Sequence, residues 1–158
     1  MSLPAILTAS AALENADAGL AAIGFKHAFD EPPEGLMQSI PCSVRFAEPG
    51  SILQASRLMG RYNIYNFKVE FHWPRGVSWK AVENILPVID AVQTLYAANL
   101  SIGGTCDVCV FRDPAYEGPM LVRYSEGHPV TIAIIFYFEA KEILDDITVT
   151  LSPGVPAY

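Results

Sequence analysis

The sequence from Tyr62 to Trp73, YNIYNFKVEFHW, decides the fold together with the Pro74-Arg-Gly76 turn and the segment Trp79 to Asn99 that follow it. From Tyr65 to Trp73 apolar and polar residues alternate. A strand that buries one face has this period of two. We therefore expect a long strand with an aromatic core face and a polar outer face.

The segment after the turn has the pattern of an amphipathic helix, with apolar residues at spacings of three and four. These residues are Trp79, Val82, Ile85, Leu86, Ile89, Val92 and Tyr96. Ser78 is placed to cap the N-terminus of the helix. Pro87 removes a backbone donor within it and predicts a kink. We expect this apolar stripe to pack on the aromatic face of the preceding strand.

Length and composition indicate one soluble domain. The chain has 158 residues, of which 51% are hydrophobic, enough for one core. Its net charge is -7 with ten Lys and Arg, so a surface that binds nucleic acid is disfavoured, although an acidic protein can line a passage for DNA. The N-terminus has no basic signal segment and there is no apolar run of membrane-spanning length, which predicts a cytoplasmic protein without membrane contact.

Two elements are expected before the central strand. Residues Pro4 to Ile23 are alanine-rich with near-helical apolar spacing and stop at Gly24, which predicts a first helix. Phe25 to Phe29 fits a short strand before a proline-containing loop.

A hairpin or extended arm is expected over about residues 36–60. Ser39 to Phe46 alternates as a strand, Glu48-Pro49-Gly50 has turn chemistry, and Ser51 to Leu58 fits a returning strand or a short helix nearly equally well.

The second half of the chain completes the sheet. We expect strands at Thr105 to Arg112 and Met120 to Tyr124, separated by an Asp113 to Pro119 loop. Val130 to Lys141 is apolar on both faces and needs cover on both. The predicted fold is thus a single α+β domain, residues 1–143, with a mainly antiparallel (mixed) sheet, two packed helices and a projecting hairpin or arm. Residues 144–158, rich in proline, form an extended C-terminal tail.

Motifs for catalysis, cofactors or metals are weak. Cys106 and Cys109 have the spacing of redox and zinc motifs, but they lie in a predicted strand without a second pair, so we interpret them as structural thiols. An odd total of three cysteines does not suggest a disulfide framework. We expect no catalytic, cofactor or metal site. The alternative is a ligand-binding or catalytic pocket between sheet and helix near His72, Trp73 and Arg75.

The most suggestive non-core residues lie around the Asp113 to Pro119 loop. Tyr and Arg are favoured at protein interfaces, although an ordinary surface loop with an anchoring tyrosine explains them equally well. The predicted interface residues are Glu48, Pro49, Gly50, Arg57, Arg61, Arg112, Tyr116 and Glu117.

The order of elements resembles the tail terminator (tail completion, neck) proteins of long-tailed bacteriophages. The likeness lies in Tyr65 to Trp73, Trp79 to Tyr96, Arg112 to Pro119 and Thr131 to Glu142. It implies a structural virion protein without an active site, found in the phage tail or neck and in the host cytoplasm during assembly.

The resemblance also implies partners. Six copies would form a ring on the last ring of tail-tube protein, stop its polymerisation and bind the head connector, while DNA passes through the channel without specific binding. The arm from Ser39 to Leu58 would contact a neighbouring subunit or the tube. Another neck or tail-tube joining protein is the near alternative.

Overall fold

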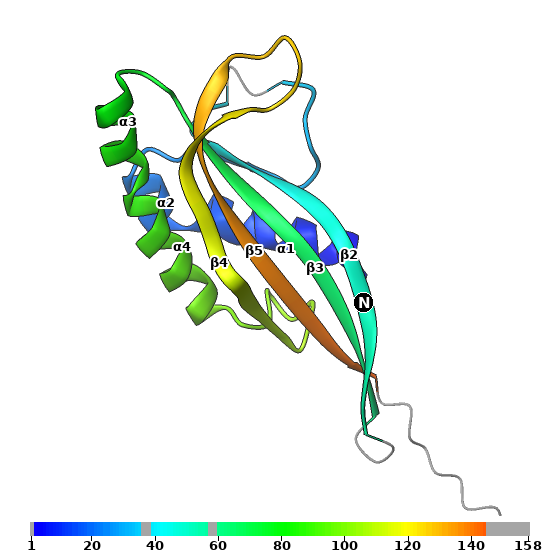
Figure 1. Ribbon diagram of the computed structural model, residues 1–158. Coiled ribbons are helices and arrows are strands. Elements are labelled where there is room, and N and C mark those ends of the chain that lie inside the picture. Colours follow the sequence, from blue (N-terminus) through cyan, green and yellow to red (C-terminus); the bar gives the residue numbers. More distant parts are fainter. Residues whose placement is uncertain (1, 36–38, 57–59, 145–158) are drawn as a thin grey trace, which may run out of the picture.

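The alternating stretch Tyr62 to Trp73 belongs to a long strand, β3 (Gly60–Trp73), inside a five-stranded sheet of order β1-β2-β3-β5-β4 (Figure 1). The computed structural model of the protein describes residues 2–35, 39–56 and 60–144. All neighbouring strands are antiparallel except β1 (His27–Phe29), which runs parallel to β2. The sheet is therefore mixed and the α+β prediction is confirmed. Of the predicted tail, residues 144–158, Leu144 is the last residue of β5, and residues 145–158 lie outside the described part of the chain.

The first helical region is interrupted. It consists of α1 (Leu3–Ala16) and α2 (Ala18–Ala22), where one continuous helix was expected. The Asp17 carboxylate accepts a hydrogen bond from the Leu20 N–H at 2.9 Å, so it caps α2. The sequence signal for the break was this Asp, which favours caps over helix interiors.

The second helical region breaks at Pro87, as expected, into α3 (Ser78–Ile85) and α4 (Pro87–Ala98). Its N-cap residue is Val77, so the expectation that Ser78 would cap the helix was wrong by one position.

The face that this region turns to the sheet differs from the predicted stripe. The buried residues are Ala81, Ile85, Val88, Val92, Leu95 and Tyr96. Trp79 is 64% exposed, and Val82 and Leu86 are also exposed. The sequence contains two adjacent apolar stripes, of which the sheet covers one. The other stripe remains at the surface.

The second strand, β2 (Cys42–Ser56), passes straight through Glu48-Pro49-Gly50, where a turn was expected. A shift of register between Glu48 and Ser51 marks a bulge. A Cβ at Gly50 would lie 2.4 Å from the Ile64 carbonyl oxygen, so the bulge requires glycine. The two strands pair from Cys42 opposite His72 to Ser56 opposite Gly60, and residues 57–59 between them lie outside the described part of the chain.

The predicted Asp113 to Pro119 loop is also wrong, because it belongs to one long edge strand, β4 (Val108–Arg123). Two register shifts, after Phe111 and after Glu117, accommodate its extra residues. The last strand, β5 (Val130–Leu144), lies between β3 and β4. Its two neighbours pair with both of its edges, while the cover of its faces must come from layers above and below the sheet.

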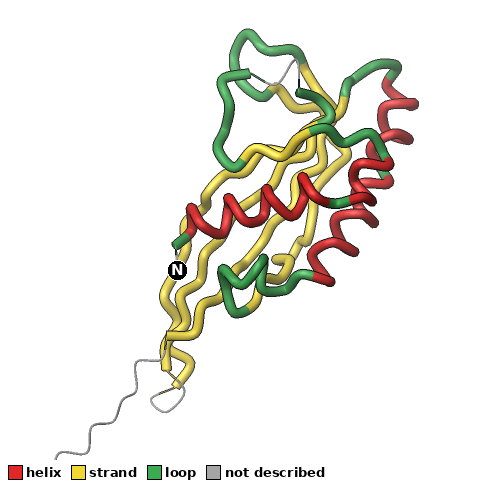
Figure 2. Tube along the Cα trace, turned by 180° about the vertical axis from the view of Figure 1, so that it is seen from behind, coloured by secondary structure: helices red, strands yellow, loops and turns green. Residues whose placement is uncertain are grey.

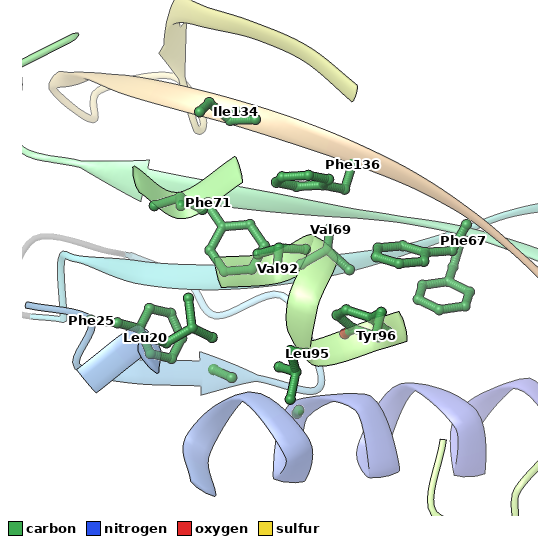
Figure 3. Close-up of a cluster of buried hydrophobic side chains, with 14 of the residues drawn as sticks. Leu20, Phe25, Phe67, Val69, Phe71, Val92, Leu95, Tyr96, Ile134 and Phe136 are labelled. Atoms are coloured by element: carbon green, nitrogen blue, oxygen red, sulfur yellow. The ribbon is translucent and has the colours of Figure 1, made fainter. Parts of the chain in front are cut away.

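Helices cover one face of the sheet (Figure 2). On that face Phe67, Val69 and Phe71 of β3 and Ile134 and Phe136 of β5 point toward helical side chains, as Figure 3 shows. The helical partners include Leu20, Val92, Leu95 and Tyr96. The rings of Phe67 and Phe138 stack at 5.0 Å, and those of Phe71 and Phe136 meet edge-on at 5.6 Å. Within the described residues, no helix has the length and apolar character needed to cross a bilayer.

Loops cover part of the opposite face. Cys42 and Val44 of β2 are buried there against Phe29, Ile40 and Tyr124. Ile135 and Ala133 of β5 are buried on this face as well. Both faces of β5 are thus covered near its N-terminal end, as its sequence requires.

Candidate interaction surfaces

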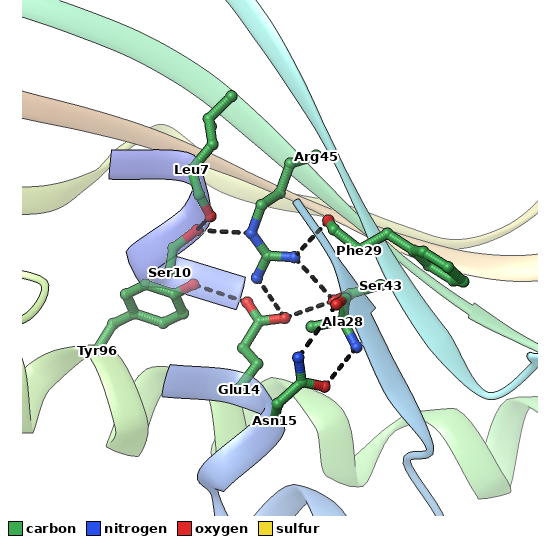
Figure 4. A network of polar contacts seen from close by, with 9 residues as sticks. All are labelled: Leu7, Ser10, Glu14, Asn15, Ala28, Phe29, Ser43, Arg45 and Tyr96. Carbon is green, nitrogen blue, oxygen red and sulfur yellow. Dashed lines mark hydrogen bonds and ion pairs between the residues drawn. The ribbon is translucent and has the colours of Figure 1, made fainter. Parts of the chain in front are cut away.

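A buried polar network anchors α1 to the sheet (Figure 4). Arg45, fully buried on β2, places its Nη2 2.6 Å from Glu14 Oε2 of α1 and donates from Nε to Ser10 Oγ. Tyr96 of α4 donates to the other Glu14 oxygen at 2.7 Å. Burial alone would lower the pKa of Arg45, but the Glu14 carboxylate outweighs this effect and raises it. Because the network is closed to solvent, we interpret it as structural.

A second polar cluster lies on the opposite face of the sheet. The His72 ring contacts Thr131 Oγ1 through Nδ1 at 2.7 Å and Glu70 Oε1 through Nε2 at 3.2 Å. Burial opposes ionisation of Glu70, but His72 and Lys68 more than offset it, so the pKa of this carboxyl is lowered. His72 itself is fully buried.

The alternative site near His72, Trp73 and Arg75 is not assembled as one pocket. A cavity of about 380 Å³ does lie beside Trp73, and Lys80 is its one ionisable lining residue. His72 points to the other face of the sheet, and Arg75 lines a different cavity.

The cysteines are buried free thiols. The strand β4 begins at Val108, so Cys106 precedes it and Cys109 lies within it. Both nevertheless enter the same apolar core, because the turn before β4 redirects Cys106. Burial raises the pKa of the Cys106 thiol to about 11 and that of Cys42 to about 12, which keeps both protonated at neutral pH. Across the described ranges, His, Cys, Asp and Glu side chains form no group of three suited to a metal ion.

Loops leave part of the sheet face opposite the helices uncovered, and we call this part the open face. It brings three predicted interface residues together. The bulge of β4 lets Arg112 Nη1 reach Glu48 Oε2 of β2 at 2.7 Å, across β5 and β3. Glu117 lines the same cavity of about 220 Å³, beside Tyr137. Burial and the hydrogen bond to Glu117 raise the pKa of Tyr137.

Basic side chains on the open face are paired with carboxylates. Besides Arg112, Lys68 Nζ lies 3.0 Å from Glu70 Oε2 and 5.0 Å from the centre of the Phe46 ring. Lys141 Nζ lies 3.1 Å from Glu139 Oε1. Each of these three cations is therefore neutralised by a carboxylate neighbour.

The other predicted interface residues are dispersed. Pro49 and Gly50 form the β2 bulge, where the Pro49 carbonyl accepts a hydrogen bond from Asn66 Nδ2 at 2.9 Å. Tyr116 packs on Phe136 at 5.7 Å, on the helix-covered face. Arg57 and the side chain of Arg61 lie outside the described part of the chain.

A further surface, which sequence reasoning missed, lies where α3 meets the edge strand β4; we call it the edge groove. Its exposed apolar residues are Trp79, Val82 and Leu86 on the helical side and Leu121 of β4. A cavity of about 140 Å³ separates Val82 from Leu121 and is also lined by Arg75. The sequence signal for this surface was the second apolar stripe of the helix, which we expected to lie in the core.

Comparison with known protein families and with curated proteins found no match for the chain. Two surfaces of the molecule, the open face and the edge groove, bear on its function.

Proposed function

We propose that the protein is a structural virion assembly protein, a ring-forming tail terminator that caps the tail tube and joins the tail to the head connector. The observation that carries the proposal is the open face, a helix-free sheet surface whose basic side chains, Lys68, Arg112 and Lys141, are each held by a carboxylate.

Neutralised cations suit a surface along which DNA must pass without adsorbing. Nonspecific binding to DNA depends on Lys and Arg that contact phosphates and release counterions. On the open face these groups are already paired, while Asp113 and Glu117 add negative charge around the same cavity. The net charge of -7 acts in the same direction. We propose that this face lines the channel.

A ring also needs a surface for neighbouring copies. Exposed apolar patches with polar rims mark interaction sites, and head-to-tail contacts between different patches close into rings. The edge groove supplies one such patch, separate from the open face. Together the two surfaces support a subunit that contacts neighbours at its edge and DNA with its sheet.

Native mass spectrometry and negative-stain imaging of the full-length protein test this proposal. We expect closed rings of a single thickness, with six copies as the expected number, at high protein concentration. Open stacks would favour a tail-tube protein, and closed rings of another size would favour a different neck protein. A strict monomer at high concentration would contradict ring formation.

The cavity beside Trp73 favours a second candidate function, the binding of a small ligand. Its volume of about 380 Å³ lies within the range of ligand sites. Trp73 fluorescence during a screen of small metabolites would test this function. A saturable change that the substitution Ala81→Phe abolishes would support it, because Ala81 lines the cavity.

A further inference from the structure

The edge groove combines exposed apolar surface with unpaired positive charge. Trp79 is 64% and Leu121 54% exposed, although both are large apolar side chains. Arg75 lines the cavity between α3 and β4. Among the described residues it has no carboxylate within ion-pair distance, in contrast to the cations of the open face. A complementary ligand would be acidic and apolar.

The groove also offers backbone groups for strand addition. It ends at Met120 to Arg123 of β4, an edge strand that pairs with β5 on its other side. Alternate residues of an edge strand point their N–H and C=O groups away from the sheet. An extended peptide with apolar side chains on one face could therefore pair there and fill the cavity beside Val82.

The C-terminal sequence of the chain has this chemistry. Asp145-Asp146 is followed by Ile147-Thr-Val-Thr-Leu151, in which apolar and β-branched polar residues alternate. Such alternation suits a strand with one apolar face. Residues 145–158 contain Asp145 and Asp146 and no Lys or Arg, so the charge of the segment is opposite to that of Arg75 in the groove.

The segment cannot reach the groove of its own copy. Leu144 ends β5, whereas Leu121 pairs with Ile132, twelve residues earlier in β5. At about 3.3 Å per residue these two levels of the strand are about 40 Å apart. Val149, five residues beyond Leu144, can extend at most about 18 Å from it. Any docking of this sequence on the groove must therefore join two copies.

We propose that the C-terminal segment 145–158 of one copy docks in the edge groove of a neighbouring copy, with Ile147 to Leu151 along β4 and Asp145-Asp146 near Arg75. The segment acts as a strap between subunits. This inference rests on the proposed function because it assumes a homo-oligomer. It adds that the C-terminal segment of one copy meets the edge groove of the next.

Disulfide trapping between two full-length chains tests the strap. One chain carries Leu121→Cys and the other, distinguished by isotope labelling, carries Val149→Cys; the native cysteines are buried. We expect mixed oxidation to give mainly the heterodimer of the two variants. A matched control replaces Leu121→Cys with Ala12→Cys, which is exposed on α1 away from the groove. The control should give at least fivefold less heterodimer.

Charge variants provide a second measurement. Arg75→Glu in the Leu121→Cys chain should lower the heterodimer yield severalfold, since the new carboxylate repels Asp145 and Asp146. Lys26→Glu, exposed beside β1, should leave the yield unchanged.

Two results would overturn the inference: heterodimer no more abundant than with Ala12→Cys, or Leu121→Cys homodimers alone, which would mean that grooves pack on each other. Either result together with closed rings would leave the proposed function intact. A trapped strap without rings would instead contradict the ring and keep the strap.

Discussion

At the residue scale, the closed network around Arg45 determines how firmly α1 is held. Arg45 and Glu14 are both fully buried and face each other from β2 and α1. A buried ion pair contributes little relative to an apolar pair, but breaking one side leaves an uncompensated charge, which is costly. Neither residue stood out in the sequence, because the partners are thirty-one positions apart and meet only after α1 has docked on β2.

The substitution Arg45→Met should therefore lower the free energy of unfolding by about 3–5 kcal/mol. Urea unfolding measures the change. Adding Glu14→Gln should restore part of the loss, because the amide keeps an acceptor for Tyr96 without a charge. Lys26→Met, exposed at the surface, is the matched control and should change little. A loss for Arg45→Met as small as that of the control would contradict this role.

The ionisation of Glu70 makes the stability of the fold depend on pH. Its pKa is lowered below the ordinary 4.5 by His72 and Lys68, despite burial, so the ionised form stabilises the native state. This contribution is present above about pH 4.5 and is lost as the pH falls through the lowered pKa. We expect the wild type to be more stable than Glu70→Gln at pH 7 and the gap to close toward pH 3 in urea titrations. Glu126→Gln, exposed in a loop, should show no such trend, and a gap constant with pH would contradict the argument.

At the element scale, the alternation of apolar residues and the positions of proline predicted those features that depend on residues close together in the chain. The strand ending at Trp73 and the break at Pro87 both follow from the sequence. Glu48-Pro49-Gly50 and the segment around Gly118 were read as turns, because the same residues serve turns and bulges. Whether such residues form a turn or a bulge depends on the strand that pairs with them. The pairing of Glu48 with Arg112 was likewise beyond prediction, since it depends on the order of four strands.

The two bulges predict which glycines resist substitution. Gly118 has φ +103°, and a Cβ there would lie 2.7 Å from the Ala133 carbonyl oxygen. Gly118→Ala and Gly50→Ala should each lower the free energy of unfolding by about 1–3 kcal/mol, the usual cost of overpacking. Gly19→Ala in α2 is the control, since its Cβ would approach only a side chain, the Asp17 carboxylate at 3.2 Å, and no backbone atom within 4 Å. Thermal unfolding should show a smaller loss for this control than for the other two; equal losses in the three variants would refute the bulge argument.

At the scale of the whole molecule, charge is distributed unevenly between the two surfaces. Cations on the open face are held by carboxylates, whereas Arg75 at the edge groove has no such partner among the described residues. This distribution fits the two tasks that we propose for the surfaces: passage of DNA over one, and attachment of an acidic segment at the other.

Releasing the cations of the open face should make it adhere to DNA. The double substitution Glu48→Gln with Glu139→Gln leaves Arg112 and Lys141 without their carboxylate partners. We expect measurable binding to duplex DNA at low salt, falling steeply as salt rises. Glu83→Gln with Glu126→Gln makes the same change in net charge away from this face and should not produce it. Equal binding by both variants would show that net charge alone controls adsorption.

The prolines of β4 have a consequence for how the protein behaves when concentrated. Pro114 and Pro119 lie in an edge strand, where each removes a donor that an incoming strand would need. The middle of this edge therefore cannot template indefinite growth of a cross-β aggregate, and pairing is confined to its two ends. We therefore expect less fibrous precipitation on concentration than from an edge strand without these prolines.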